Sequence, residues 1–476
     1  MRRPNIVLIV SDQHNPHVAG YAGNRFVRTP NLDRISAEGV VFKSAYCSSP
    51  VCGPSRMSYM TGKYVHQIEN WWNAVPLDPA EPTWAGELDR NGIETTLLGK
   101  IDAPGEYENP GFTHYRLSMR RKAFDPYPRR EPQAKMLAGA TRPSSRRHIE
   151  HAGSFKPDDI GEIGAGYDPR HGLYFQDRQV SDWAGEFLEE KAGSESGRPW
   201  VLHVGFEYPH WPYVCPERFF NMYYPDRAEI PGNCRFSEDL HPALKEWERW
   251  NDLGELPRDD LVRALAAYYG MVTALDEMTG EIITRLKAQG EYDNTYIIYT
   301  SDHGDSAGEH GFFFKHCCLE GSAGVPLIMR GPGIEPGTTV GTPVSLVDLY
   351  PTIMDCFGLE SDGGLPGQSL FRTMEGGGKR DSVFSEWHGP GFKGAWYMLC
   401  RGDFKYTWYE SFPPSLYNLA EDPGENRDLA QDPEFADLVR DFEKELRSLV
   451  NPEAISLKAK RDLGVITADG RDLSRE

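Results

Sequence analysis

The sequence has no long apolar run near its start, little cysteine and no excess of positive charge. The apolar stretch Ile6–Val10 is too short for the hydrophobic core of a signal peptide or for a membrane-spanning helix. The 8 cysteines among 476 residues include no Cys-x-x-Cys pair, which argues against a disulfide scaffold and a cysteine zinc site. The 51 Lys and Arg against 71 Asp and Glu give a net charge of −20, which repels nucleic acid and anionic membranes. We therefore expect a cytoplasmic protein that binds neither nucleic acid nor membrane.

Four apolar, β-branched segments are each followed by polar side chains. They are predicted as buried strands of a parallel sheet and comprise Asn5–Val10, Glu94–Gly99, Trp200–Phe206 and Thr295–Thr300. Between them, Asp259–Gln289 has apolar residues at three- and four-residue spacing, which predicts a long helix. Strands that alternate with helices indicate an α/β sandwich. Ligands bind such sheets at the carboxyl ends of the strands, so we expect the functional residues there.

The glycine-rich residues 376–378 predict a division of the chain near residue 375. Residues 1–375 would form the α/β catalytic domain and residues 376–476 a smaller C-terminal α+β subdomain. In the second part, the sequence predicts antiparallel strands and one amphipathic helix, at 382–387, 395–399, 404–409 and 433–450. Residues 120–168, rich in Arg, Pro, Gly and Ser, are expected to cross the active edge of the sheet without regular structure.

The segment Cys52-Gly53-Pro54-Ser55-Arg56 carries the most specific chemical signal. Pro54 suits a first helical position, so Cys52 is expected just before a helix, where free N–H groups favour an anion. Arg56, one turn further on, offers a fixed fork of donors to an oxyanion. An isolated cysteine in such a turn is more often a buried packing residue, so the surrounding motifs decide between the two interpretations.

Those motifs resemble the sulfatase family. The resemblance extends over nearly the whole chain through Ser11-Asp12-Gln13-His14, Cys52–Arg56 with Thr61-Gly62, Gly99-Lys100, Pro209–Tyr213, Ser301–Gly304, Gly308–Gly311 and Leu416–Leu419. It implies an alkaline phosphatase-like fold with a large mixed, mostly parallel sheet. It also implies that a formylglycine-generating or maturase enzyme oxidises Cys52 to formylglycine, whose hydrate is the nucleophile.

Asp12, Gln13, Asp302 and His303 follow two of the predicted strands and are candidate metal ligands. Their mainly oxygen donors suit a hard divalent cation better than zinc, although a single Asp is more often a cap or turn residue. The resemblance implies Ca²⁺, with Mg²⁺ and Mn²⁺ as alternatives, and it implies that His303 and position 52 also contact the metal.

The resemblance assigns Lys100, His210 and Lys315 to the cations that bind sulfate and to the acid that protonates the leaving group. Taken singly, such lysines and histidines are more often solvated or satisfied polar residues. In the implied mechanism, the metal and Arg56 favour the hydrate at position 52, whose oxygen attacks sulfur. His210 or Lys315 then protonates the departing alcohol, and elimination regenerates the aldehyde.

The chain departs from the family at Gly99-Lys100-Ile101-Asp102, where most sulfatases have histidine in place of Asp102. Asp102, His14 or His66 would have to take over the role of that histidine. The same block, with His66, Trp72-Asn73, Asn294-Thr295 and Ser385–His388, resembles the arylsulfatase K branch, which acts on 2-sulfated glucuronate. We therefore treat His66, Asp102, Trp72 and His388 as candidate substrate contacts, although packing explains Trp72 equally well.

The predicted function is hydrolysis of an aryl or carbohydrate sulfate, including a uronate 2-sulfate. The negative net charge favours a small sulfated substrate over a long polyanion. The alternatives are a phosphonate monoester or phosphodiester hydrolase of the same superfamily, and a non-catalytic binder of sulfated ligands if Cys52 is unmodified. The sequence is also compatible with an oligomer.

Overall fold

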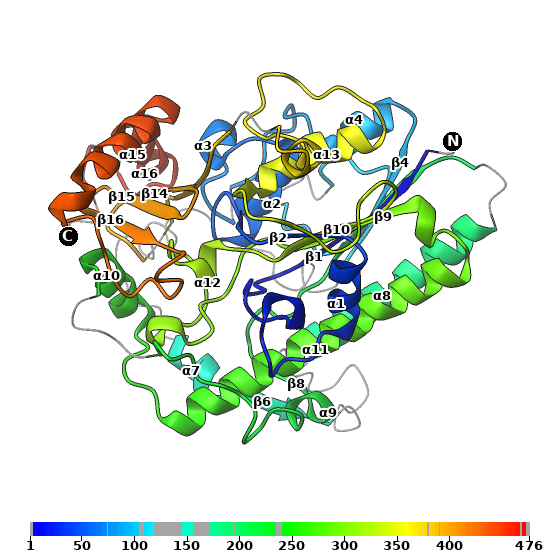
Figure 1. The fold of residues 1–476 in the computed structure, drawn as a ribbon, viewed down its shortest axis with the longest axis horizontal. Coiled ribbons are helices and arrows are strands. Elements are labelled where there is room, and N and C mark those ends of the chain that lie inside the picture. The colour runs from blue at the N-terminus through cyan, green and yellow to red at the C-terminus, as the bar shows by residue number, and fades with distance from the viewer. Residues whose placement is uncertain are drawn as a thin grey trace.

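The computed structural model describes residues 3–73, 75–103, 109–118, 145–156, 172–193, 197–234, 240–377, 380–389, 391–466 and 469–472. Its main sheet has eight strands in the order β11-β2-β10-β9-β1-β7-β4-β5 (Figure 1). These are β1 (Asn5–Ser11), β2 (Val40–Phe42), β4 (Glu94–Gly99), β5 (His114–Leu117), β7 (Trp200–Gly205), β9 (Thr295–Ser301), β10 (Leu327–Arg330) and β11 (Thr338–Val340). Only β10 pairs antiparallel with its neighbours, so the sheet is mixed and mostly parallel, as predicted.

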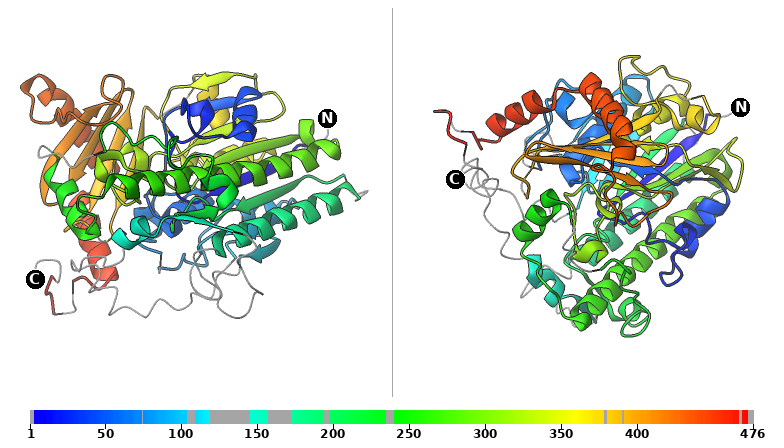
Figure 2. Two further views of the ribbon diagram at one scale, coloured as in Figure 1. Left: turned by 90° about the horizontal axis from the view of Figure 1, so that it is seen from below. Right: turned by 60° about the vertical axis from the view of Figure 1, so that its left-hand side comes forward.

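Both faces of the main sheet are covered by helices, which is why β1 is apolar at successive positions. Val7 and Ile9 pack into one buried cluster, whereas Ile6, Leu8 and Val10 pack into another on the opposite face. The first cluster is closed by α1 (Pro30–Ala37), α8 (Gly172–Ala192), α9 (Glu217–Phe220) and α11 (Arg258–Ala288). The second is closed by α2 (Cys52–Thr61), α4 (Trp84–Arg90), α13 (Leu349–Cys356) and α14 (Leu370–Met374) (Figures 1 and 2).

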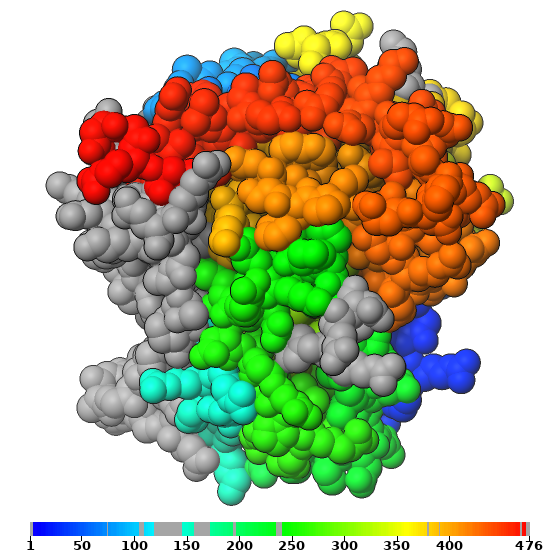
Figure 3. Space-filling view, turned by 90° about the vertical axis from the view of Figure 1, so that its left-hand side faces the viewer, coloured from blue at the N-terminus to red at the C-terminus, as the bar shows by residue number. Residues whose placement is uncertain are grey.

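The C-terminal part contains a four-stranded antiparallel sheet. Its strands are β13 (Ser382–Trp387), β14 (Trp396–Arg401), β15 (Phe404–Tyr409) and β16 (Phe412–Asn418), followed by α15 (Ala436–Leu449) and α16 (Pro452–Asp462). Phe442 and Leu446 of α15 pack on one face of this sheet. The other face packs against α10 (Pro242–Asn251) of the main unit, and Figure 3 shows orange C-terminal residues directly against the green ones. The predicted strands and helix are confirmed, while the boundary near residue 375 stays a prediction.

Shorter elements complete the described chain. Two-stranded sheets join β3 (Ala45–Tyr46) to β12 (Val344–Ser345) and β6 (Gly153–Phe155) to β8 (Val214–Pro216), and the remaining α-helices are α3 (Val65–Ile68), α7 (Ser145–Glu150) and α12 (Glu320–Ala323). Most of the segment 120–168, predicted to be irregular, lies outside the described residues. Within its described portion, residues 145–150 form α7 and residues 153–155 form β6, so these parts are regular. None of the described helices is both long and apolar enough to cross a membrane.

Candidate active site

The candidate site is assembled where four neighbouring strands of the main sheet end. Ser11 of β1 is in register with Ser301 of β9, so Asp12 and Asp302 emerge side by side. On the other side of β1, β7 and β4 end together in the register Gly205 to Gly99. This places Glu207 and His210, which follow β7, and Lys100, which follows β4, at the same edge of the sheet. The candidate residues that follow these strands therefore lie together at the edge of the sheet where such folds bind ligands.

The close approach of β4 and β7 requires glycine at both strand ends. A Cβ atom on Gly99 would lie 2.1 Å from the carbonyl oxygen of Gly205, and one on Gly205 would lie 2.0 Å from that of Lys100. Gly99 also has a φ of +87°, which residues with a side chain rarely adopt. In this way the backbone around Lys100 is fixed, with its N–H donating to the oxygen of Gly205 at 2.8 Å.

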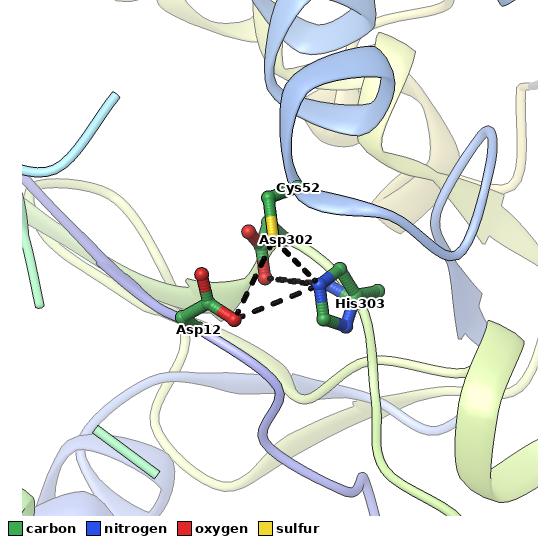
Figure 4. A group of neighbouring side chains, drawn as sticks. All are labelled: Asp12, Cys52, Asp302 and His303. Carbon is green, nitrogen blue, oxygen red and sulfur yellow. Dashed lines mark hydrogen bonds and ion pairs between the residues drawn. The ribbon is translucent and has the colours of Figure 1, made fainter. Parts of the chain in front are cut away.

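Cys52 is the first residue of α2, rather than lying just before the helix as predicted. Pro54 is therefore the third helical residue, which is tolerated because the first four N–H groups of a helix have no intrahelical acceptor. The Cys52 thiol is buried among the strand-end residues (Figure 4), with its Sγ 3.4 Å from His303 Nε2 and 3.9 Å from Asp12 Oδ1. The ligand atoms of Asp12, Cys52, Asp302 and His303 all lie within 4.8 Å of one another.

Arg56 is fully buried beneath this group and connects three of the strand ends. Its Nε donates to Asp302 Oδ2 at 2.8 Å, and its terminal nitrogens donate to the carbonyl oxygens of Lys100 at 3.1 Å and Ser11 at 3.4 Å. The guanidinium thus neutralises Asp302 and fixes the positions from which Asp12 and Lys100 project.

Two lysines complete the positive charge of the site. Lys315 Nζ lies 3.1 Å from both Cys52 Sγ and His303 Nε2. Lys100 Nζ lies 2.5 Å from Asp12 Oδ2, 3.0 Å from Glu207 Oε2 and 3.1 Å from Asp102 Oδ2. Lys315 therefore lies beside position 52 and Lys100 beside Asp12, where their charges could neutralise an anionic ester group.

Burial and neighbouring charge set the protonation of the site. Burial favours the neutral form of Asp12, but Lys100, His210 and Lys315 outweigh it and hold its pKa well below the ordinary value. Burial and the nearby Asp12 raise the pKa of Asp302 to about 7, against the opposing effect of Arg56. Burial and Asp12 also raise the pKa of the Cys52 thiol to about 12, so an unmodified Cys52 is not a thiolate at neutral pH.

The donor set fits a hard divalent cation. His303 Nδ1 lies 3.0 Å from the carbonyl oxygen of Gly304, so its proton is on Nδ1 and the lone pair of Nε2 faces the cluster. Burial and the charge of Lys315 hold the pKa of His303 well below its usual value, which keeps the ring neutral. The Oε1 atom of Gln13 is buried and accepts no hydrogen bond among the described residues. Two carboxylates, an imidazole nitrogen and an unpaired amide oxygen are suitable ligands for Ca²⁺, Mg²⁺ or Mn²⁺.

The other predicted residues lie in two places. His210 and Asp102 belong to the same site, because His210 influences Asp12 and Asp102 contacts Lys100. His66 and His388 form a second cluster around Glu386, with nitrogen to oxygen distances of 2.9 and 2.8 Å.

Trp72 packs among aromatic rings, and the distances between ring centroids are 5.5 Å to Trp387 and 5.6 Å to His316. Its neighbour Asn73 accepts a hydrogen bond from the N–H of Gly53 at 2.8 Å. The alternative residue His14 has both ring nitrogens bonded, to Tyr299 and to the carbonyl of Val18.

Sequence reasoning assigned no role to three buried acids that contact the predicted residues. Glu207 contacts Lys100, Asp305 contacts Gln13, and Glu386 lies between His66 and His388. Glu207 follows a strand directly and Asp305 follows His303 by two residues, so both carried the same positional signal as the predicted ligands. Glu386 had no such signal, because it lies within β13 rather than after a strand of the main sheet, and its partner His66 is distant in sequence.

Comparison with known proteins identifies related families, sequences and structures. The family model described as Sulfatase matches residues 4–359, and the one described as N-sulphoglucosamine sulphohydrolase, C-terminal, matches residues 308–452. Arylsulfatase K of Danio rerio is 31% identical over 96% of this chain and 86% of the relative. Choline-sulfatase of Rhizobium meliloti (strain 1021) is 31% identical over 90% of this chain and 83% of the relative. The crystal structure of phosphonate monoester hydrolase of Agrobacterium radiobacter is 28% identical and has a TM-score of 0.73, covering 94% of this chain and 95% of that one.

The chain therefore belongs to the sulfatase family and is a sulfuric ester hydrolase. Within the family, relatives at 30% and 31% identity over 96% of the chain place it in the arylsulfatase K-like branch of the type I sulfatases.

Proposed function

We propose that the chain hydrolyses the sulfate ester of a small aryl or carbohydrate substrate, using a formylglycine hydrate made from Cys52 by a maturation enzyme. The observation that carries the proposal is the position of Cys52, whose Sγ lies 3.1 Å from Lys315 and 3.4 Å from His303 at the end of the central strands. The raised pKa of the thiol makes unmodified cysteine a poor nucleophile there. A hydrated aldehyde supplies instead a hydroxyl that attacks sulfur and a second hydroxyl that later expels sulfate.

We propose Asp12, Gln13, Asp302, His303 and position 52 as the residues that would hold the cation, taken as Ca²⁺ with Mg²⁺ and Mn²⁺ as alternatives. The bound cation would supply positive charge next to the nucleophile and the sulfate oxygens. Arg56 acts on this group by holding Asp302 and the backbone of Lys100 and Ser11. Its contacts support a positioning role as well as a contribution to neutralising charge.

The remaining cations would act on the ester group. Lys100 and Lys315, with side chains 7% and 5% exposed, bind the sulfate oxygens as charge develops on them. His210 or Lys315 donates a proton to the alcohol oxygen as the bond to sulfur breaks. The Nδ1 atom of His210 lies 2.5 Å from the carbonyl oxygen of Trp211, which fixes the ring. If His210 is the acid, the proton that it donates is the one on Nε2.

For the substrate we propose a sulfated monosaccharide or short oligosaccharide, with a uronate 2-sulfate as the first candidate. The arylsulfatase K-like sequence supports this choice. Asp102 is the best placed of the proposed substrate contacts, because its side chain is 24% exposed beside Lys100. Roles for His66, Trp72 and His388 in binding substrate, like a cytoplasmic location and an oligomer, stay predictions.

The first experiment is a peptide mass measurement of the segment that contains Cys52, combined with turnover of the Cys52→Ala variant. An aldehyde mass is expected in protein made together with a maturation enzyme, and Cys52→Ala should lower kcat by at least about 10³-fold. Cys215→Ala is the matched control, because Cys215 is equally buried but lies in the distant β8 strand, and its activity should be nearly unchanged. Substantial turnover by Cys52→Ala would contradict the proposal.

A second candidate function is hydrolysis of phosphonate monoesters or phosphodiesters, favoured by the 28% identity to the phosphonate monoester hydrolase. Comparing kcat/KM for matched aryl sulfate, phosphonate and phosphodiester substrates separates the two functions. Including 2-sulfated glucuronate and choline sulfate in the panel tests the substrate class.

A further inference from the structure

Asp305 is a fully buried carboxylate beside the proposed ligands to which the mechanism above gives no role. Its Oδ2 accepts hydrogen bonds from Gln13 Nε2 and from the Tyr213 hydroxyl, both at 2.5 Å. Its Oδ1 accepts from the backbone N–H groups of Ala307 at 2.7 Å and Phe314 at 3.0 Å. All four contacts are donors that point at one acidic side chain.

These contacts determine which end of the Gln13 amide faces Asp305. The amide has a donor end, NH₂, and an acceptor end, Oε1, whereas an ionised carboxylate can only accept. The NH₂ end must therefore face Asp305, and Oε1 is left on the other side of the amide group. That oxygen is buried and has no hydrogen-bond partner among the described residues, which is unfavourable unless another group compensates it.

We propose that Asp305 is a positioning residue that orients the Gln13 amide, so that oxygen rather than nitrogen is available to the divalent cation. The inference rests on the ligand role of Gln13 in the proposed function. Without Asp305, the amide could turn its NH₂ group towards the cation. The partial positive charge of the NH₂ group would then face the positive charge of the cation, which disfavours binding. The residue thus acts through Gln13 and does not touch the substrate.

Asp305 also holds the backbone that leads to Lys315, so the test has to preserve that function. Asp305→Asn does so, since the remaining oxygen can still accept from Ala307 and Phe314. The new amide nitrogen then replaces Oδ2 and donates towards Gln13. The Tyr213 hydroxyl can turn to accept from this nitrogen, but the NH₂ group of Gln13 can only donate. Gln13 therefore has to rotate its amide, which withdraws Oε1 from the cation.

The experiment is calorimetric titration of Ca²⁺ into the metal-stripped full-length protein, with the state of position 52 matched by peptide mass. Asp305→Asn should weaken Ca²⁺ binding by about 10–100-fold, and so should Gln13→Ala. The double variant should bind no more weakly than Gln13→Ala alone, because both changes remove one interaction. Tyr213→Phe is the control, since it deletes a different hydrogen bond to the same carboxylate, and its Ca²⁺ affinity should stay near that of the wild type.

Wild-type affinity in Asp305→Asn, or fully additive losses in the double variant, would overturn the inference while leaving the ligand role of Gln13 intact. Wild-type affinity in Gln13→Ala would instead overturn that ligand role and the inference with it. If Asp305→Asn alone does not fold, it is combined with Gln13→Glu. One oxygen of the new carboxylate at position 13 then accepts a hydrogen bond from the new amide nitrogen at position 305, and the other oxygen is left for the cation. That pair should fold and bind Ca²⁺ within about threefold of the wild type, and failure to bind would also overturn the inference.

Discussion

Glu386 illustrates how a single buried acid links distant segments of this chain. It lies on β13 of the C-terminal sheet, with Oε1 2.9 Å from Nδ1 of His66 on α3 and Oε2 2.8 Å from Nε2 of His388. Burial opposes its ionisation, but His66 and His388 outweigh it and lower the pKa of Glu386 to about 2. Burial alone would lower the pKa of His66, but Glu386 outweighs that effect and raises it above the ordinary 6.5. Glu386 and His66 therefore each stabilise the charged form of the other.

Replacing Glu386 by Gln should lower the free energy of unfolding in a pH-dependent way. The contribution of Glu386 is present above its unfolded pKa near 4.5 and is lost as the pH falls towards about 2. The contribution of His66 is present below 6.5 and is lost as the pH rises through its raised pKa. The free energy of unfolding should thus be lower in Glu386→Gln than in the wild type by about 1.5–3 kcal/mol. This difference should be largest between about pH 4.5 and pH 6.5.

Urea unfolding across the pH range would measure this difference. The exposed Glu421→Gln is the matched control and should follow the wild type at every pH. A loss of stability in Glu386→Gln that does not vary with pH would show that packing, rather than charge, holds the two segments together.

At the scale of elements, the C-terminal sheet depends on a helix that covers only one of its faces. On α15, Phe442 is fully buried and stacks on Tyr406 at 5.6 Å between ring centroids, whereas Leu449 at the end of the same helix is 48% exposed. The helix therefore packs on the sheet through its apolar face, which includes Phe442.

Phe442→Ala should destabilise the protein by about 3–5 kcal/mol, because it removes a buried ring and leaves a cavity between α15 and the sheet. Leu449→Ala on the same helix should change the free energy of unfolding by no more than about 0.5 kcal/mol. Chemical denaturation of the two variants tests this, and equal effects would contradict the described packing of α15.

The elements also differ in how far the sequence predicted them. The central strands β1, β4, β7 and β9 were predicted because helices on both faces make them apolar throughout. The edge strand β5 was missed, since its side chains are largely exposed and form no apolar pattern. The short strands β2 and β10 were missed because three or four residues give too little periodicity.

At the scale of the whole molecule, buried charges join the C-terminal sheet to the main unit. Lys405 of β15 is fully buried, lies 2.8 Å from Glu320 on α12 and forms a second ion pair with Glu425. Such pairs connect residues far apart in sequence, so no local pattern could predict them. The strand-end residues of the candidate site were predictable because motif and strand position coincide, whereas the contacts of Asp305 and Glu386 depend on the folded arrangement.

The lysines that face the candidate site are recessed, and this has a consequence for how fast substrate arrives. Lys100 and Lys315 are almost fully buried and Lys100 is surrounded by carboxylates, so at long range an approaching anion meets the field of a molecule with net charge −20. Salt screens that repulsion beyond about 10 Å at 0.1 M ionic strength. The kcat/KM for an anionic sulfate ester should therefore rise with ionic strength, whereas that for choline sulfate, which has no net charge, should change little. A kcat/KM for the anionic ester that falls with added salt would mean that exposed cations attract the substrate. A kcat/KM that rises would mean that the protein's own field opposes its capture.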